Sequence, residues 1–259
     1  MPAHVINLSV IIPCYNELKN LEAGVLDEVN AYLSQQHYIW EVIVSNDESS
    51  DGSRQFVSDF IQDKDNWSLV DIKHGGKPAA VWAGIQAARG EIILFTDMDQ
   101  STPITELEKL LPWYEQGYDV VIGSRGTHRE GTSFFRQLGS IIFLTLRQLI
   151  ILSQIRDTQC GFKSCRRQVA LDTFPKLQFF KEQENPTGWK VSAYDVELLF
   201  LAQHMGYRLK DVEVEWYNRD LSDTKSPEGA MKRYIRESME MAREVARVKM
   251  NQIKGNYNK

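Results

Sequence analysis

Two aspartates separated by a single residue are the most chemically suggestive feature of the sequence. Asp97 and Asp99 follow the apolar run EIILF at residues 91–95, and ligands of open α/β sheets bind beyond the carboxyl ends of the strands. Mg²⁺ is commonly held by one or two carboxylates together with substrate phosphates, and a bound metal would neutralise charge on a departing diphosphate. Because two acidic residues can equally end a strand and cap the next helix, this pair alone is weak evidence of a site.

Polar clusters also follow two earlier runs that are typical of strands. PCYNE occupies residues 13–17, and NDESSDGS occupies residues 46–53. Carboxylates and a tyrosine at these positions could hydrogen-bond a ribose and a base, and all three strand ends would share one edge of the sheet. We interpret residues 51–53 as a plain turn, in which Asp51 or Ser53 caps the next helix. Asp47 stays open to a structural and a functional interpretation.

A glycine pair precedes a lysine in the segment HGGKP at residues 74–78. Glycines let the backbone approach a ligand, and Lys77 can meet a phosphate as a point charge. The chain contains neither GxxxxGK[ST] nor GxGxxG, which argues against a P-loop and a Rossmann dinucleotide site. The five histidines lack a metal-ligand spacing such as HExxH.

The elements that must position these residues alternate along the chain. Apolar, β-rich runs separated by helical patterns predict βαβ units around a largely parallel sheet. We expect strands at residues 8–13, 41–45, 68–72, 91–97 and 119–124, and a later one within 207–218. Helices are predicted as one unit through residues 18–29, from about residue 53, and at 134–155, 192–203 and 227–253.

The composition is that of an ordinary globular protein. Of 259 residues, 42% are hydrophobic and 25% charged, and the net charge of -5 provides no general attraction to nucleic acid. Three cysteines without a CxxC pair argue against a disulfide framework or zinc site and favour a reducing cytoplasm. The N-terminus lacks the build of a signal peptide, and the apolar stretch 141–155 falls short of the roughly 20 residues that cross a bilayer. We therefore predict a cytoplasmic protein without a transmembrane segment, and peripheral membrane contact stays open.

Six motifs together resemble those of family-2 glycosyltransferases with the GT-A fold. Their order and spacing are similar for VIIPCYNE, NDESSDGS, GGKPAAVWAGIQAARGEIILFTDMD, VVIGSR, DTQCGFK and YDVELLFLA. Within that family the chain resembles the polyprenyl-phosphate hexose synthases, and DMDQSTP and DTQCGFK resemble the dolichyl-phosphate glucosyltransferase branch. The likeness runs from Leu8 to Lys225. It implies an α/β fold with a mostly parallel central sheet, flanking helices and a C-terminal helical extension.

The resemblance also implies a division of the chain and roles for single residues. Residues 1–225 would form the glycosyltransferase domain, with a nucleotide-sugar half at 8–125 and an acceptor half at 126–225, followed by a helix and tail at 226–259. The donor nucleotide-sugar would contact Pro13, Tyr15, Asn16, Glu17, Asp47, Lys77, Asp97 and Met98. A divalent cation, Mg²⁺ or Mn²⁺, would be held by Asp97 and Asp99.

The acceptor side follows from the same resemblance. The acceptor and its phosphate would be bound by Arg125, Arg136, Gln159, Arg219 and Lys225. The catalytic roles would fall to Asp99, Arg125 and Glu197. Arg219 and Lys225 resemble part of a mobile basic loop that closes over the phosphates.

Four positions depart from the commoner family pattern, namely Asn46, Glu48, Pro78 and Met98. These departures leave the identity of the donor open, with UDP-glucose and GDP-mannose as the candidates. They bear on which donor is used more than on the type of reaction.

The mechanism implied by the family is an in-line attack with inversion. A phosphate-monoester acceptor carries roughly -1.5 to -2 charges near neutral pH and needs little help from a base. A sugar hydroxyl acceptor would need one, and Asp195 and Glu197 are the candidates, with Glu197 favoured. Both carboxylates could instead simply favour the start of a helix electrostatically. A sugar-phosphate nucleotidyltransferase is disfavoured because no glycine-rich, arginine-containing loop follows the first strand. A binding module without activity is disfavoured because the expected site residues are intact, namely Asp97, Asp99, Lys77 and Arg125.

Two helical stretches leave membrane contact undecided. The apolar segment 134–152 is either core or a helix that lies in the plane of a lipid surface with Arg136 and Arg147 near headgroups. The predicted C-terminal helix carries mixed charges, which usually form a solvated face with i,i+4 pairs. A membrane-surface role for that helix is the alternative.

Overall fold

Seven strands form one central sheet in the computed structural model, which describes residues 7–125, 152, 155–182, 194–222 and 230–257. In spatial order the strands are β3 (Trp67–Ile72), β2 (Trp40–Asp47), β1 (Leu8–Cys14), β4 (Ile92–Phe95), β6 (Lys163–Arg166), β5 (Val120–Arg125) and β7 (Leu209–Val214). β6 is antiparallel to both neighbours, and the other ladders are parallel. The prediction of a mostly parallel sheet is confirmed.

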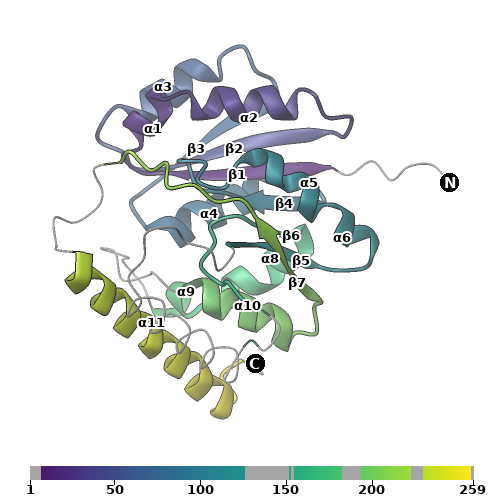
Figure 1. The fold of residues 1–259 in the computed structure, drawn as a ribbon, viewed down its shortest axis with the longest axis vertical. Coiled ribbons are helices and arrows are strands. Elements are labelled where there is room, and N and C mark those ends of the chain that lie inside the picture. Colours follow the sequence, from purple (N-terminus) through teal and green to yellow (C-terminus); the bar gives the residue numbers. More distant parts are fainter. Residues whose placement is uncertain (1–6, 126–151, 153–154, 183–193, 223–229, 258–259) are drawn as a thin grey trace.

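Helices cover both faces of the sheet, because its central strands are apolar on both sides (Figure 1). One face carries α1 (Leu18–Glu22), α2 (Val25–Leu33), α3 (Ser53–Phe60), α5 (Leu107–Leu110) and α6 (Pro112–Glu115), with a 3₁₀ turn at Ile104–Glu106. The other carries α4 (Lys77–Ala87), α8 (Arg167–Thr173) and α10 (Tyr194–His204), followed outward by α11 (Ala230–Ile253). The short α9 (Gln178–Glu182) follows a 3₁₀ turn at Phe174–Lys176.

Two predicted elements differ from the structure. The single helix expected through residues 18–29 is two helices, because Gly24 takes a left-handed conformation with φ of 85° between them. The strand expected at 91–97 ends at Phe95, so Asp97 and Asp99 lie in the loop beyond it. The sequence also failed to indicate β6, a four-residue strand whose polar sequence KSCR has no apolar pattern.

The remaining predictions were met where the structure describes them. The late strand is β7, and the helices predicted at 192–203 and 227–253 are α10 and α11. Most of the apolar segment 134–155 lies outside the described residues, although Leu152 and Ile155 are buried in the core. The domain division stays a prediction, but β6 and β7 from the predicted acceptor half join the same sheet as β1–β5. Among the helices that the structure describes, none is both long and apolar enough to cross a bilayer.

Candidate active site

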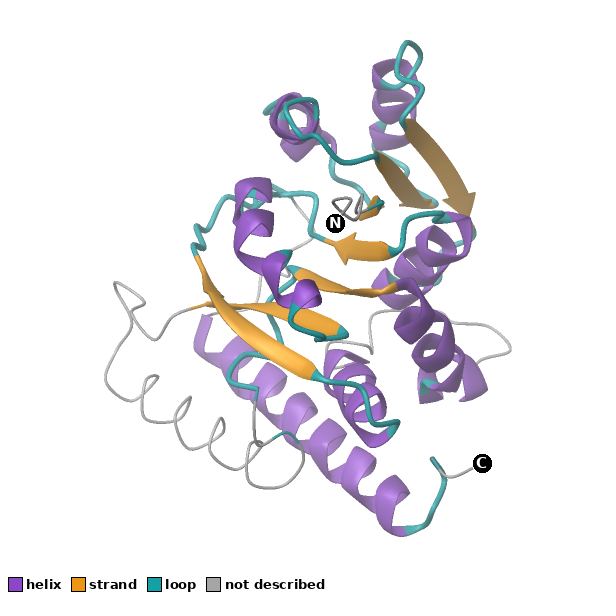
Figure 2. Ribbon diagram, turned by 90° about the vertical axis from the view of Figure 1, so that its right-hand side faces the viewer, coloured by secondary structure: helices purple, strands orange, loops and turns teal. Residues whose placement is uncertain are grey.

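The carboxyl ends of three adjacent strands build the candidate site. β2, β1 and β4 lie side by side and run parallel, so the loops after them meet at one edge of the sheet, as predicted. Figure 2 shows the strands of the sheet with helices on either side. Each loop contains a residue in the left-handed conformation, with φ of 54° at Asn16, 59° at Glu48 and 48° at Gln100. Residues other than glycine rarely adopt this conformation, and such strain clusters at functional sites.

Asp97 and Asp99 differ in their surroundings. The Asp97 carboxylate forms an ion pair with Lys77 Nζ at the start of α4. Burial opposes its ionisation, but the charges of Lys77, Lys163 and Arg125 prevail and lower the pKa of Asp97. Asp99 Oδ1 accepts the backbone N–H of Ser101 at 2.8 Å, while burial and the nearby Asp97 charge raise the pKa of Asp99.

Gly161 lies directly against the Asp97 carboxylate. A Cβ atom at this glycine would stand 1.9 Å from Asp97 Oδ2, a distance that no side chain tolerates. The preceding carbonyl, of Cys160, accepts a hydrogen bond from Lys163 Nζ. Glycine is therefore required here by the close approach of the backbone to a carboxylate.

These carboxylates suit a divalent cation. Within the described ranges, no group of three or more histidine, cysteine, aspartate or glutamate side chains could hold a metal ion. Burial, together with the charges of Asp220, Asp99 and Asp97, raises the pKa of Glu17 to about 7, so Glu17 lies within electrostatic range of both carboxylates. Two hard carboxylate ligands that leave the other positions to phosphate oxygens and water are an arrangement that Mg²⁺ accepts. The residues therefore fit a metal that binds together with a diphosphate.

The loop after β3 lies against the loops after β1 and β2. The Asp47 carboxylate, buried at the end of β2, accepts the backbone N–H groups of Gly75 at 2.7 Å and Gly76 at 2.9 Å. His74 Nδ1 stands 3.0 Å from the same carboxylate, and the His74 ring stacks on Tyr15 with centroids 4.5 Å apart. Asp47 therefore shapes the loop that ends at Lys77, and its predicted contact with base or ribose stays a prediction.

The segment around Asp51 ties the first two loops together, which supports its interpretation as structural. Asp51 accepts the backbone N–H of Ser53, the first residue of α3, and that of Leu18, the first residue of α1, each at 3.0 Å. Ser53 Oγ accepts the backbone N–H of Glu17 at 2.8 Å, and Asn16 Oδ1 accepts that of Ser50 at 2.8 Å. Asn16 and Glu17 are thus held in place by the loop that follows β2.

Among the predicted acceptor residues, Arg125 lies within electrostatic range of Asp97. Its guanidinium makes a paired contact with Asp157, with Nε 2.7 Å from Oδ2 and Nη2 3.0 Å from Oδ1. Burial disfavours the charged form, but Asp157 raises the pKa of Arg125, with further contributions from Cys160 and Asp97. Gln159 is exposed, and its backbone N–H donates to Asp157.

Arg219 lies in the segment after β7 and makes a bidentate contact with Glu28 of α2, at 2.8 and 2.6 Å. Its backbone N–H lies 3.4 Å from Ser101 Oγ, so this segment runs close to the loop that carries Asp99. Arg136 and Lys225 lie outside the described residues. Their acceptor roles stay predictions.

Two predicted site residues point elsewhere. The Met98 side chain is 2% exposed and belongs to the hydrophobic core. Glu197, predicted as catalytic, is 1% exposed and lies between α10 and α11. It accepts hydrogen bonds from Arg247 at 2.9 Å and Tyr257 at 2.8 Å. Both side chains are therefore buried in this structure, and their roles at the site stay predictions.

Asp195 is the carboxylate of α10 that faces the site. Its Oδ1 atom lies 2.9 Å from Nζ of the fully buried Lys163. Burial lowers the pKa of Lys77, but Asp97 and Asp195 outweigh it and raise that pKa, which places Asp195 within electrostatic range of the strand ends. Pro13, the remaining predicted residue, is half-buried near the end of β1.

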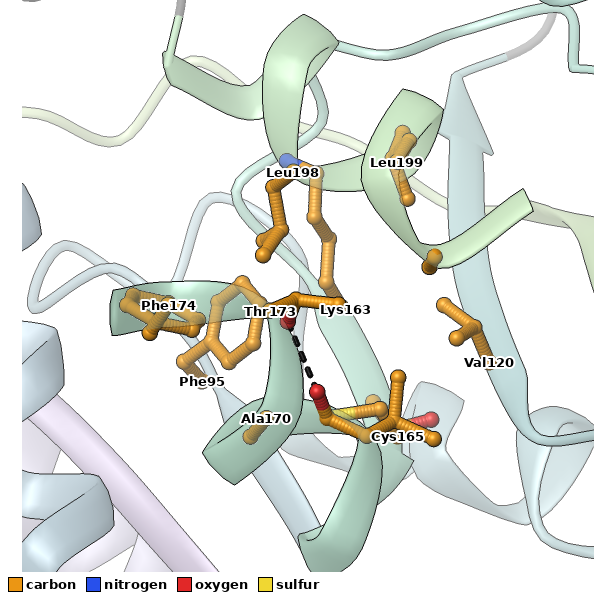
Figure 3. A pocket seen from close by; sticks show the side chains of 12 residues that line it. Phe95, Val120, Lys163, Cys165, Ala170, Thr173, Phe174, Leu198 and Leu199 are labelled. Carbon is orange, nitrogen blue, oxygen red and sulfur yellow. Dashed lines mark hydrogen bonds between the residues drawn. The ribbon is translucent and has the colours of Figure 1, made fainter. Parts of the chain in front are cut away.

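The sequence assigned no individual role to Lys163, Asp157 or Gly161, although all three lie within the motif DTQCGFK, whose residues around Gln159 were expected to shape the acceptor and sugar site. Figure 3 shows Lys163 extending beside a small cavity toward the helix that carries Leu198. The cavity is lined mainly by apolar residues of β4, β5, β6, α8 and α10. It contains none of the carboxylates described above and is a feature of the core.

The fold and this edge of the sheet define a class of protein, the glycosyltransferases with the GT-A fold. Mannosyl-3-phosphoglycerate synthase from Rubrobacter xylanophilus superposes with a TM-score of 0.63 over 96% of this chain and 75% of its own, at 16% identity. Glucosyl-3-phosphoglycerate synthase from Mycobacterium tuberculosis, crystallised with Mn²⁺, UDP and phosphoglyceric acid, gives 0.63 over 94% and 78%, also at 16% identity. These likenesses establish the fold.

The chain belongs to glycosyl transferase family 2, whose family model matches residues 9–174. It is similar to the dolichyl-phosphate beta-glucosyltransferases of Mus musculus, at 35% identity, and Homo sapiens, at 34%, over 81% of this chain and 67% of each relative. The enzyme of that name from Dictyostelium discoideum is 30% identical over 98% of this chain and 77% of its own. The chain spans about two thirds of the mouse and human relatives. The predicted family and the prediction of a hexosyltransferase are confirmed.

Proposed function

We propose that the protein transfers a hexose, with inversion, from a nucleotide-sugar to a polyprenyl phosphate in a reaction that requires a divalent cation. The observation that carries this proposal is the convergence of Asp97 and Asp99 with Lys77 and Arg125 at one edge of the sheet. The names of the mouse and human relatives support glucose as the sugar and a dolichyl-type phosphate as the acceptor.

The donor is a UDP- or GDP-linked sugar. The Mycobacterium tuberculosis enzyme was crystallised with Mn²⁺ and UDP-glucose, and a mannosyltransferase from Pyrobaculum calidifontis, with a TM-score of 0.54 and 20% identity, was crystallised with GDP-Man and Mn²⁺. Both support a nucleotide-sugar donor and a divalent metal for this chain. When bound, the cation would neutralise charge that develops on the departing diphosphate.

The chain's own residues supply positioning and charge. Asp99 Oδ1 accepts the backbone N–H of Ser101, and its second carboxylate oxygen would bind the metal. Lys77 and Arg125 provide cationic groups for phosphate oxygens, with Arg125 oriented by Asp157. Asp97, held between Lys77 and Gly161, would share the metal with Asp99 and also fixes the position of the Lys77 ammonium. Such preorganised charges stabilise a transition state without reorganising during the reaction.

A phosphate acceptor agrees with the contacts of the α10 carboxylate that faces the site. Asp195 is the one carboxylate of α10 near the site, and it is held by the buried Lys163 ammonium. A phosphate monoester is already anionic and attacks without losing a proton to the protein. We therefore assign Asp195 to positioning and expect the nucleophile to be the acceptor phosphate.

Calorimetric titration tests the donor site. We expect one of UDP-glucose and GDP-mannose to bind in the presence of Mn²⁺ and to lose binding when the metal is omitted. Asp99→Asn should abolish metal-dependent binding and lower transfer by about 100-fold or more, since it removes a charged metal ligand. Asp63→Asn, at an exposed position outside the site, is the matched control. Donor binding that is equally tight without metal, or unchanged in Asp99→Asn, would contradict the proposal.

The acceptor is tested separately with a radiolabelled donor. Label should transfer to a polyprenyl phosphate and not to the corresponding free polyprenol, because only the former brings an anionic nucleophile. Transfer to the free alcohol or to a saccharide would reject the phosphate acceptor while leaving the donor site intact.

A further inference from the structure

Helix α11 is fixed in its rotation by a buried polar contact. Arg247 pairs with Glu197 of α10 at 2.9 Å and also with Glu244 of α11 itself. Tyr257, beyond the helix, donates to Glu197 at 2.8 Å, and Val248 is fully buried in the core. One face of α11 therefore packs against the rest of the protein. The opposite face cannot turn inward without breaking the Glu197 contacts.

The opposite face exposes apolar side chains in a continuous stripe. At 100° per residue, Met239, Ala242, Ala246, Met250 and Ile253 fall within an arc of about 80°. All five are exposed, with exposed fractions of 49% for Met239, 53% for Met250 and 75% for Ile253. We call these five residues the α11 stripe. Figure 1 shows α11, in yellow, at the edge of the molecule beside α9 and α10. Because all five side chains are exposed, the described elements leave the stripe uncovered.

Cations border the stripe on both sides. The exposed Arg243 and Lys254 follow it on one side, and the half-exposed Lys249 lies on the other. The nearest acidic side chain that the structure describes on this helix, Glu244, is turned toward Arg247 and the protein. An apolar stripe with lysine and arginine at its margins is the pattern of helices that lie in the plane of a membrane interface.

We propose that the α11 stripe docks on the surface of an anionic lipid bilayer. The apolar side chains would enter the boundary between headgroups and acyl chains, and the bordering cations would contact lipid phosphates. The inference rests on the proposed function in one respect, since a polyprenyl-phosphate acceptor resides in a membrane. It adds a specific surface to that function, because Glu197 joins α11 to the same helix, α10, whose first turn carries Asp195.

Sedimentation with vesicles tests the docking surface. We expect the full chain to bind vesicles of equal parts phosphatidylcholine and phosphatidylglycerol, and to bind pure phosphatidylcholine weakly. The double variant Met250→Gln/Ile253→Gln should reduce the partition coefficient at least about tenfold, since each side chain contributes apolar area. Arg243→Glu/Lys254→Glu should weaken binding to the anionic vesicles more than to neutral ones. Ile39→Gln, which changes an apolar residue that is 66% exposed on another part of the surface, is the matched control and should bind as the unmodified protein does.

The outcomes separate this inference from the proposed function. Unchanged vesicle binding in the Met250→Gln/Ile253→Gln variant would overturn the docking surface, whatever the transfer assay gives. A stripe that instead mediates self-association, seen as a dimer in analytical ultracentrifugation that the same variant dissociates, would also overturn it. Donor binding by calorimetry should be identical in all these variants, because none of them lies at the strand ends. If the protein binds vesicles through α11 but transfers no sugar to polyprenyl phosphate, the proposed acceptor fails and the docking surface stands.

Discussion

Gly161→Ala offers a sharp test of the site geometry. The new Cβ atom would lie 1.9 Å from Asp97 Oδ2 and 2.5 Å from Asp97 Cγ, whereas ordinary contact begins at 3.4 Å. Either the Asp97 carboxylate or the backbone at residue 161 must therefore move by about 1.5 Å. Lys77 holds the carboxylate, and Lys163 holds the neighbouring carbonyl of Cys160, so both movements disturb the site.

The magnitude follows from that displacement. A misplacement of about 1 Å at reacting groups can lower a rate by about 100-fold, which corresponds to about 2.7 kcal/mol in the barrier. Overpacking a close contact costs about 1–3 kcal/mol of folding stability. We therefore expect kcat/KM to fall by about 100-fold, with weaker metal-dependent donor binding, in a protein that still folds.

The assay combines kcat/KM for transfer, donor titration with Mn²⁺ and the thermal midpoint of unfolding. Gly206→Ala is the control, since Gly206 also tolerates alanine poorly, with φ of 89°, but a Cβ there meets nothing within 4 Å. It should lose some stability and keep its activity. The reasoning would be refuted by a folded Gly161→Ala enzyme whose kcat/KM lies within about threefold of the unmodified value.

Two further predictions concern buried ion pairs. Glu197→Gln should destabilise the fold by about 1–3 kcal/mol, less than the usual cost of breaking a buried pair because Arg247 keeps Glu244. We expect a lower denaturation midpoint with unchanged kcat for the folded fraction, and a selective loss of kcat would instead support the predicted catalytic role of Glu197. Burial disfavours the charged form of Asp157, but Arg125 lowers the pKa of Asp157 to about 2, below its ordinary value near 4. Its charge therefore stabilises the fold above pH 4, by about 2 kcal/mol, and this contribution is lost as the pH falls from about 4 through about 2. The difference in denaturant midpoint between the unmodified protein and Asp157→Asn should shrink over that range, and a difference independent of pH would contradict the ion pair.

Much of the sheet is predictable from local patterns. β1, β2 and β4 are continuous apolar runs, and such runs form strands buried on both faces almost irrespective of what covers them. Their loops carry the polar residues, so the position of Asp97 and Asp99 at a sheet edge follows from chain order and parallel pairing. β6 was missed because four polar-rich residues become a strand only when β4 and β5 bind them on either side.

Local sequence patterns could not predict which cation each carboxylate of α10 contacts. Asp195 and Glu197 are two residues apart on α10, about 200° around the helix, so one faces Lys163 and the other faces Arg247. A negative charge near the start of a helix is favourable at either position. The sequence alone therefore could not tell which of the two carboxylates faces the site. The choice depends on Lys163 of β6, which lies 32 residues before Asp195 in the chain, and on Arg247 of α11, which lies 50 residues after Glu197.

What the sequence determined by itself was therefore the class of fold, the edge of the sheet at which the candidate site lies, and the family. These three conclusions follow from hydrophobic periodicity and from motifs, both of which can be read within a few neighbouring residues. The tertiary structure alone decided that Gly161 and Lys163 confine Asp97, that Glu197 anchors α11, and that α11 turns a stripe of apolar side chains outward. Each depends on contacts between distant segments, where burial and geometry select one partner from several chemically equivalent ones.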